Sequence, residues 1–391
     1  MASSSTPPES PAPSSSAGAP ANQGFWNRIS EGREWDDLLA QFTADTRASY
    51  GFYGKDMDWE QVNAMSRWRR PFYIGRHIFW ALLMKMTAAR RMILFIALLL
   101  LVLSNIKLHL GHGMDFDFSF EIIASLLLLV LLSLELADKV TMKRDLEIAR
   151  EIQSWLVPSH PPGVAGANVA FYTRPQNSVA GDYYDAFYPA DDAASGGKLF
   201  LVIADVAGKS VPAALLMATF QASLHTIARG GVSLAEVVHR LNQYACAHSL
   251  DGRRFTTAVL AEYEPASRRL TYVNAGHNAP MLRRAGTPAD TVIERLQVGG
   301  MPLGISPDAS YETASLVLHP NDALILFTDG VVEAFNAANE EFSDARLLSL
   351  VRNLPDWDGQ RSLQFLVQHL DEFVGATKQF DDITCLILRC E

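Results

Sequence analysis

The sequence predicts an α+β domain over residues 159–391, preceded by a helical linker and a pair of apolar segments. Within the domain, short apolar or alternating runs typical of strands come first, two helical stretches follow, and further strands and late helices complete the chain. Strands with inserted helices indicate α+β layering. Upstream of the linker, two apolar runs of about 19 residues are each long enough to cross a bilayer.

Composition limits the classes of partner and compartment. The 391-residue chain carries a net charge of −10. Nucleic acid is not expected as a partner, because binding its phosphates requires an excess of basic residues that this acidic chain lacks. The three cysteines, Cys246, Cys385 and Cys390, form no CxxC pair and no zinc-ligand spacing. They indicate reduced thiols in a cytoplasm-like compartment.

The first 91 residues carry little pattern. Residues 1–22 are almost wholly Ser, Pro, Ala, Gly and Thr, which cannot bury a core, so we expect a disordered tail. Residues 23–91 are expected to form a cytoplasmic N-terminal region that is helical in part. Its last segment, Pro71–Arg91, is basic and aromatic. That composition fits a helix on the membrane surface, and it also fits an ordinary amphipathic helix.

Residues 92–137 predict two transmembrane helices, Met92–Leu110 and Phe118–Ala137, with the short outside loop Gly111–Asp117 between them. The alternative is a buried hairpin of two core helices, but leucine-rich runs flanked by charge favour the membrane. Basic residues precede the first span and follow the second, whereas the loop has two aspartates and no base. The sequence therefore predicts a multi-pass protein of the inner (cytoplasmic) membrane, with both termini and the domain in the cytoplasm.

Residues 138–158 predict a helical linker that ends at Pro158. Its apolar residues share an arc of about 120° at 100° per residue. They are Ile148, Ala149, Ile152, Trp155 and Leu156. From the residues alone, this stripe could pack on the chain's own domain. The segment is too short to identify a coiled coil.

The domain elements follow from periodicity and turn signals. Strands are expected at 169–173, 186–188, 199–204, 257–263, 269–274, 280–283, 312–318, 323–328 and 383–389. Helices are expected at 212–228, 234–246, 346–352 and 362–373.

Acidic residues stand at the ends of several of these strands. The apolar run Leu199–Ala204 ends at Asp205, just before a small-residue turn and a helix. Taken alone, Asp205 is most simply explained as a turn or helix cap. The pattern recurs elsewhere, at Asp182, Asp185, Asp329, Asp381 and Asp382. Gathered carboxylates would repel one another unless a cation compensated them, and Mg²⁺ and Mn²⁺ prefer such oxygen ligands.

From about Asp145 onward, five motifs in this order resemble the PPM (PP2C-like) serine/threonine phosphatases, in their bacterial RsbU/SpoIIE branch. They are GDYYD at 181–185, DVAGK with VPAALLM at 205–217, NAGHNAP at 274–280, FTDGVVEA at 327–334 and DDIT at 381–384. The resemblance implies a four-layer α-β-β-α sandwich of two antiparallel sheets. Two residues depart from the usual turn: Lys209 stands at the often-His position and Ser210 replaces a glycine.

The resemblance also implies roles for the acidic residues around two divalent cations, Mn²⁺ or Mg²⁺. Asp205 would bridge both ions and the backbone carbonyl of Val206 would add a ligand oxygen. Asp329 and Asp381 would hold the second ion. Asp182 would ligate an ion or orient a water, and Asp382 would either ligate directly or support the ligands. Such a pair of ions can present hydroxide to phosphorus, so no protein nucleophile is needed.

Three further residues have weaker signals. Asp185 is expected to support the GDYYD turn. His277 is expected to make hydrogen bonds in a turn or the core, with contact to substrate phosphate or general-acid catalysis as the alternative. His225, in the first central helix, has no pattern beyond a helix surface. In the resembled family, the helices that match 211–228 and 233–249 act as a switch that moves metal ligands into place.

The resemblance implies a phosphatase acting on phosphoserine or phosphothreonine, with a phosphorylated STAS-domain protein, an anti-anti-sigma factor, as substrate in a partner-switching pathway. The two predicted spans would anchor it in the membrane. In the resembled family the matching linker helix can dimerise, so a homodimer through the 138–156 helix is the alternative to packing of its apolar stripe on the domain. Two alternatives belong to other classes. One is a catalytically silent signalling scaffold that binds the same partner. The other is a small-molecule phosphomonoesterase. The full set of acidic positions argues against the scaffold, and the regulatory segments before the domain argue against the small-molecule enzyme.

Overall fold

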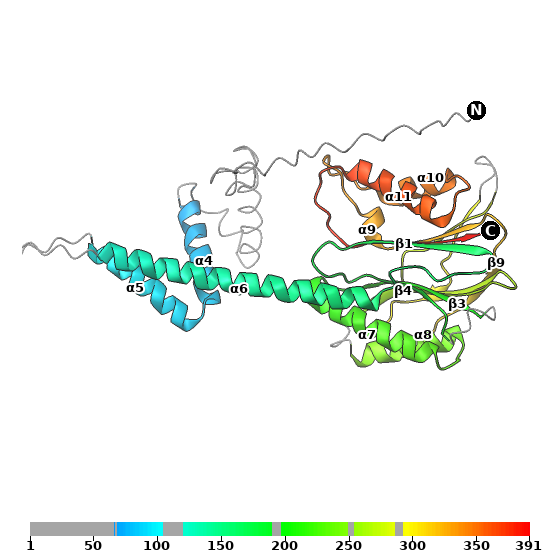
Figure 1. The fold of residues 1–391 in the computed structure, drawn as a ribbon, viewed down its shortest axis with the longest axis horizontal. Coiled ribbons are helices and arrows are strands. Elements are labelled where there is room, and N and C mark those ends of the chain that lie inside the picture. The colour runs from blue at the N-terminus through cyan, green and yellow to red at the C-terminus, as the bar shows by residue number, and fades with distance from the viewer. Residues whose placement is uncertain (1–65, 67–68, 105–119, 190–196, 249–253, 286–291) are drawn as a thin grey trace, which may run out of the picture. The chain divides into compact units, whose positions relative to one another are not determined.

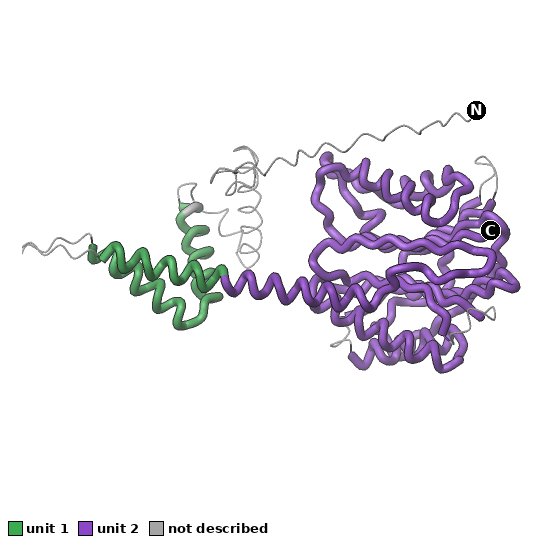
Figure 2. Tube along the Cα trace, viewed as in Figure 1, with its two compact units in different colours: residues 1–136 green, residues 137–391 purple. Residues whose placement is uncertain are grey.

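The computed structural model describes residues 66, 69–104, 120–189, 197–248, 254–285 and 292–391. The expected disordered tail at 1–22, nearly all of region 23–68, the end of the first span and the outside loop lie outside the described residues. The chain forms two compact units, residues 1–136 and residues 137–391 (Figure 2).

The first unit contains helices α4 (Arg70–Lys85), α5 (Ala88–Ser104) and the start of α6 (Phe120–Leu156). Arg90 Nη1 in α5 donates to Glu135 Oε1 in α6 over 3.0 Å. The predicted first span begins at Met92, but α5 begins four residues earlier, because Ala88–Arg91 are good helix formers that extend the apolar run. Pro71–Arg91 is correspondingly two helices rather than one.

α6 merges two predicted segments. The second span and the linker were predicted as separate elements, but α6 runs without a break over 37 residues. No proline or glycine interrupts Phe120–Leu156, so nothing in the sequence ends the helix before Pro158. By length and composition, two described helices are apolar enough to span a membrane: α6 and α7 (Ser210–Ala228), the latter a core helix of the second unit.

The second unit contains two sheets. One has the strand order β1-β11-β10-β6-β7, and the other has the order β2-β3-β4-β5-β8 with β9 also on β5. The bounds of the strands are β1 Ala167–Arg174, β2 Tyr183–Phe187, β3 Leu199–Val206, β4 Thr256–Glu264, β5 Arg269–Ala275, β6 Met281–Arg283, β7 Ile293–Arg295, β8 Gly299–Gly300, β9 Ala314–Val317, β10 Ala323–Phe327 and β11 Ile383–Cys390.

Helices cover the outer faces of both sheets, giving four layers (Figure 1). α7 and α8 (Leu234–Ala247) pack on the β2-to-β8 sheet. On the other sheet lie α9 (Asp329–Val332), α10 (Ser343–Arg352) and α11 (Gly359–Val374). This is the expected α-β-β-α sandwich. One detail differs: β8 pairs with β5 in parallel, so the second sheet is mixed rather than fully antiparallel.

The alternation of side chains along β3 explains why its sequence is apolar throughout. Leu199, Leu201 and Ile203 point between the two sheets, whereas the residues that alternate with them point toward α7 and α8. Both faces are buried, so neither can be polar. By the same alternation, Asp205 lies on the inner face, at the end of the space between the sheets.

Candidate active site

The predicted acidic residues come together because of strand pairing. β2 and β3 are antiparallel with Tyr183 opposite Ala204, so the start of β2 and the end of β3 share one edge of their sheet. Asp182 and Asp205 therefore lie at that edge. β10 and β11 are antiparallel with Phe327 opposite Cys385, which places the end of β10 beside the start of β11.

Two hydrogen bonds connect these edges across the sandwich. Thr328 Oγ1, just after β10, donates to Asp182 Oδ2 over 2.8 Å. The Gly181 amide donates to Asp382 Oδ2 over 2.6 Å. Residues 182, 328 and 382 thus meet although they come from opposite sheets and distant parts of the chain. Thr328 was not predicted as a site residue, and its place beside Asp329 in the TDG motif is the signal that identifies it.

The carboxylates raise one another's pKa values. Burial, followed by the charges of Asp329, Asp381 and Asp382, raises the pKa of Asp205 to about 7. Burial and then the charge of Asp381 raise the pKa of Asp329. The pKa of Asp182 is raised well above its ordinary value by burial and then by Asp205. These residues are therefore close enough for their charges to repel one another.

Lys209 adds the opposite charge. Its Nζ donates to Asp381 Oδ2 and to the Phe380 carbonyl, each over 2.8 Å. The lysine lies in the turn between β3 and α7, and Asp381 lies just before β11. The ion pair therefore joins the turn that follows Asp205 to the C-terminal acidic motif. The sequence identifies Lys209 only as a departure from the usual turn of the motif.

The carboxylate of Asp382 accepts hydrogen bonds from backbone amides. Besides the Gly181 amide, the Gln176 amide donates to its Oδ1 over 2.6 Å. Both carboxylate oxygens are thus engaged, which favours a supporting role over direct ligation. The Val206 carbonyl oxygen faces the same turn, 3.2 Å from where a Cβ on Gly181 would stand.

The donors fit hard divalent ions in their chemistry, since Asp205, Asp329 and Asp381 supply carboxylate oxygens that repel one another. Within the described parts of the chain, no three Asp, Glu, His or Cys side chains are arranged so that they could hold an ion as they stand. The hydrogen bonds above give the reason. Asp381 is turned to Lys209, Asp182 to Thr328 and Asp382 to two backbone amides.

His277 is a buried hydrogen-bonding residue. Its Nε2 donates to the Phe327 carbonyl over 3.1 Å, so its Nδ1 accepts from Thr257 Oγ1 over 2.8 Å. Burial lowers its pKa to about 4, which keeps the ring neutral. His277 therefore ties β4 to the end of β10, next to Thr328. This geometry confirms the core role and gives no support to a phosphate contact.

Asp185 and His225 form a pair that sequence analysis missed. Asp185 does not support the turn as expected, because it lies within β2 and its Oδ2 accepts from Tyr183 Oη (2.5 Å) and His225 Nε2 (2.7 Å). His225 also stacks on Phe187 at 4.0 Å between ring centroids. The pair attaches α7 to β2. A histidine alone in a helix carries no signal for such a partner 40 residues away.

The end of α6 also reaches the site. Gln153 makes two hydrogen bonds with the backbone of Ala180: its Nε2 donates to the carbonyl over 2.8 Å and its Oε1 accepts from the amide over 2.9 Å. A cavity of about 310 Å³ beside this contact is lined by Asp182 and Arg150, among others. The linker helix is thereby attached two residues before Asp182.

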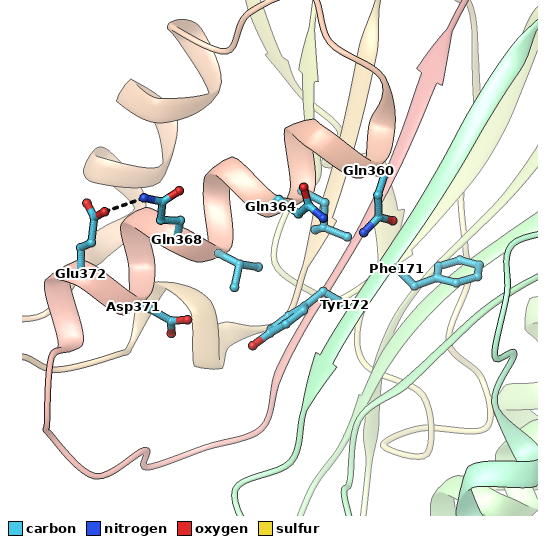
Figure 3. Close-up of a pocket in the computed structure, with 9 residues that line it drawn as sticks. Phe171, Tyr172, Gln360, Gln364, Gln368, Asp371 and Glu372 are labelled. Carbon is cyan, nitrogen blue, oxygen red and sulfur yellow. Dashed lines mark hydrogen bonds between the residues drawn. The ribbon is translucent and has the colours of Figure 1, made fainter. Parts of the chain in front are cut away.

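A second cavity, of about 620 Å³, lies between α11 and β1 (Figure 3). Tyr172, Gln364 and Asp371 line it, and none of the predicted site aspartates does. Its amide and aromatic lining has no cluster of groups suited to phosphate chemistry. The acidic edge of the sandwich is therefore the better site.

Two sheets covered by helices on both outer faces, with buried carboxylates at one edge, define a domain of the PP2C fold. The SiaA-PP2C domain of Pseudomonas aeruginosa has this fold: it aligns with a TM-score of 0.56 and 21% identity, over 65% of this chain and 99% of that one. A family model described as Stage II sporulation protein E (SpoIIE) matches residues 195–391. The chain belongs to the SpoIIE family.

Two curated relatives agree with this assignment. Phosphoserine phosphatase RsbU of Bacillus subtilis (strain 168) is 29% identical over 251 residues, covering 63% of this chain and 70% of RsbU. Protein IcfG of Synechocystis sp. is 28% identical over 283 residues, covering 66% of this chain. The chain spans only 43% of the length of IcfG. The resemblance inferred from the five motifs is confirmed.

Proposed function

We propose that this protein is a metal-dependent phosphatase that hydrolyses phosphoserine or phosphothreonine in a protein substrate. The observation that carries the proposal is the meeting of Asp182, Asp205, Asp329 and Asp381 at one edge of a PP2C-type sandwich. Similarity to a protein named phosphoserine phosphatase supports the choice of phosphoester.

Asp205, Asp329 and Asp381, with the Val206 carbonyl, would hold two divalent ions, Mn²⁺ or Mg²⁺. Bound there, the ions would supply Lewis acidity to activate water and to neutralise charge on the phosphoryl oxygens. The chain's own groups fix the donors. Thr328 donates to Asp182 Oδ2 and so orients this carboxylate, which would ligate an ion or orient a water. Asp382 fixes the Gly181–Asp182 turn.

For the substrate we propose a phosphorylated STAS-domain protein of the anti-anti-sigma type, as in partner-switching pathways. The support is membership of the SpoIIE family and similarity to RsbU. A protein substrate also fits the open edge of the sandwich, where Lys209 and Asp381 are both about half exposed.

We further propose that α5 and the first part of α6 anchor the protein in the inner membrane, with both termini and the domain in the cytoplasm. α6 is long and apolar enough to span a bilayer, and its large apolar side chains are exposed, as they are in lipid. Membrane flotation of the expressed chain, with protease access to the domain from the cytoplasmic side, tests this arrangement. Recovery of the chain in the soluble fraction would contradict it.

We propose that the 138–156 part of α6 forms a homodimer. Ile148, Ile152 and Trp155 share one face and remain exposed, Trp155 by 73%, so they do not pack on the chain's own domain. Replacing Ile152 and Trp155 by Ser should convert a detergent-solubilised dimer to a monomer in light scattering. A monomeric unsubstituted protein would contradict the proposed homodimer.

The function itself is tested by comparing substrates. The purified chain with Mn²⁺ should hydrolyse a phosphoserine protein much faster than sugar phosphates, and Asp205→Asn should remove the activity. Preference for sugar phosphates would favour the small-molecule enzyme. If Asp205→Asn left signalling intact in cells, the protein would act as a catalytically silent scaffold.

A further inference from the structure

The side-chain ammonium of Lys209 lies among the acidic residues. Its ammonium donates to one carboxylate, that of Asp381, and to the Phe380 carbonyl beside it. The lysine lies in the turn between β3, which carries Asp205, and α7. The side chain is 55% exposed, which leaves it free to move away.

Lys209 donates to Asp381 Oδ2, an oxygen that could also ligate a divalent ion. Asp381 Oδ1 accepts from the Asp382 amide over 2.9 Å, and Oδ2 accepts from Lys209. An ion that ligates Oδ2 on the side where Lys209 donates must displace the ammonium, because two cations cannot occupy the same side of one oxygen. Binding of an ion on that side of Asp381 Oδ2 thus requires that the hydrogen bond to Lys209 breaks.

We propose that Lys209 competes with the divalent ion for Asp381 and so weakens the binding of one ion. The inference rests on the proposed function for the identity of the ion, but it concerns only the affinity of the protein for that ion. Release of Lys209 would also free the turn between β3 and α7 from the loop before β11. Ion binding at Asp381 and the position of the turn are therefore coupled.

The test is direct measurement of Mn²⁺ binding to the full-length chain in detergent, by electron paramagnetic resonance of free Mn²⁺, without substrate. Lys209→Met should tighten the weakest bound ion by about three- to fivefold, because a half-exposed ion pair stabilises by up to about 1 kcal/mol. Lys209→Gln should give the same gain. The gain should shrink at high salt, which screens exposed charges.

Lys198→Met is the matched control. Lys198 is 59% exposed, pairs with Glu262 Oε2 at 3.2 Å and stands before the opposite end of β3. Its removal changes the net charge equally and should leave Mn²⁺ affinity unchanged. In an Asp381→Asn background, Lys209→Met should no longer tighten the ion, which separates the contact from a general effect of charge.

Unchanged or weaker Mn²⁺ binding in both Lys209 variants would overturn the inference, as would an equal gain in Lys198→Met. Loss of kcat/KM for phosphoprotein with unchanged ion affinity would instead make Lys209 a substrate contact. The two proposals can fail separately. Tighter binding in a chain that hydrolyses no phosphoester would leave the competition standing and refute the phosphatase. Metal-dependent hydrolysis together with unaltered Mn²⁺ affinity in the Lys209 variants would support the phosphatase and refute the competition.

Discussion

Gly330 packs directly against the backbone of Asp382, in a space that no side chain at position 330 could occupy. A Cβ there would overlap the Asp382 carbonyl oxygen. The TDG and DDIT motifs, about 50 residues apart, are therefore adjacent because one contains a glycine at the point of contact. This contact brings Asp329 beside the acidic pair that precedes β11.

Replacing Gly330 by Ala should lower the free energy of unfolding by more than about 2 kcal/mol, because backbone on both sides must shift. Thermal unfolding measures the loss. Gly163→Ala is the control, since a Cβ on Gly163 meets nothing within 4 Å. Equal stability of the two variants would show that the predicted overlap is relieved without cost.

Thr328→Val should keep the shape of the side chain and remove its hydroxyl. That hydroxyl donates to Asp182 and accepts from the Thr384 amide over 3.0 Å, so two buried polar groups lose their partner. We expect a loss of about 1–3 kcal/mol in stability and a fall in phosphatase activity. Thr271→Val, at a side chain paired with Ser315 near the surface, is the control. Full activity in Thr328→Val would rule out a role in orienting Asp182.

With divalent ions removed by a chelator, the free energy of unfolding of the protein should fall as pH rises from about 4 to 7. The folded state holds a proton on Asp205, with a pKa of about 7, whereas an unfolded aspartate loses it near pH 4. The folded state therefore binds more protons within this window, and stability decreases with rising pH. Raised pKa values of Asp182 and Asp329 act in the same direction.

Thermal unfolding at pH 5 and pH 8 measures this change. Millimolar Mg²⁺ should abolish the decrease, because ions favour the ionised carboxylates, and Asp205→Asn should reduce it. A melting temperature in chelator that rises from pH 5 to pH 8 would contradict the predicted direction.

Ser210→Gly should stabilise the protein by about 0.5–1 kcal/mol. Ser210 is the first residue of α7 and has φ +60°, a left-handed conformation that costs a non-glycine residue about 1 kcal/mol. This explains why glycine is usual at this position of the motif. Ser233→Gly, which removes the side chain that accepts from the Glu236 amide at the start of α8, should destabilise slightly in denaturant titrations. A loss of stability in Ser210→Gly would show that its hydroxyl matters more than its backbone.

The sequence predicted most of the domain because its strands are strongly apolar. Every strand predicted from an apolar or alternating run is present, whereas β7 and β8 were missed because they have only three and two residues. Too few residues remain there for any periodicity. α9 was missed for the same reason, as it has four residues and directly follows β10.

The site was predicted from motifs, but its internal connections were not. Aspartates at strand ends can be recognised because antiparallel pairing brings such ends together. The partners of Asp185 and Asp382 depend on side-chain direction and tertiary packing, which leave no spacing in the sequence. His225 and Gln176 are examples, since each is joined to its partner only in the folded chain.

Hydrolysis of a phosphoserine protein by the full-length chain, before and after exhaustive chelation, tests the central claim most directly. We expect chelation to abolish the activity, Mn²⁺ or Mg²⁺ to restore it, and neither ion to restore it in Asp205→Asn. Equal rates of hydrolysis before and after removal of all divalent ions would contradict the account.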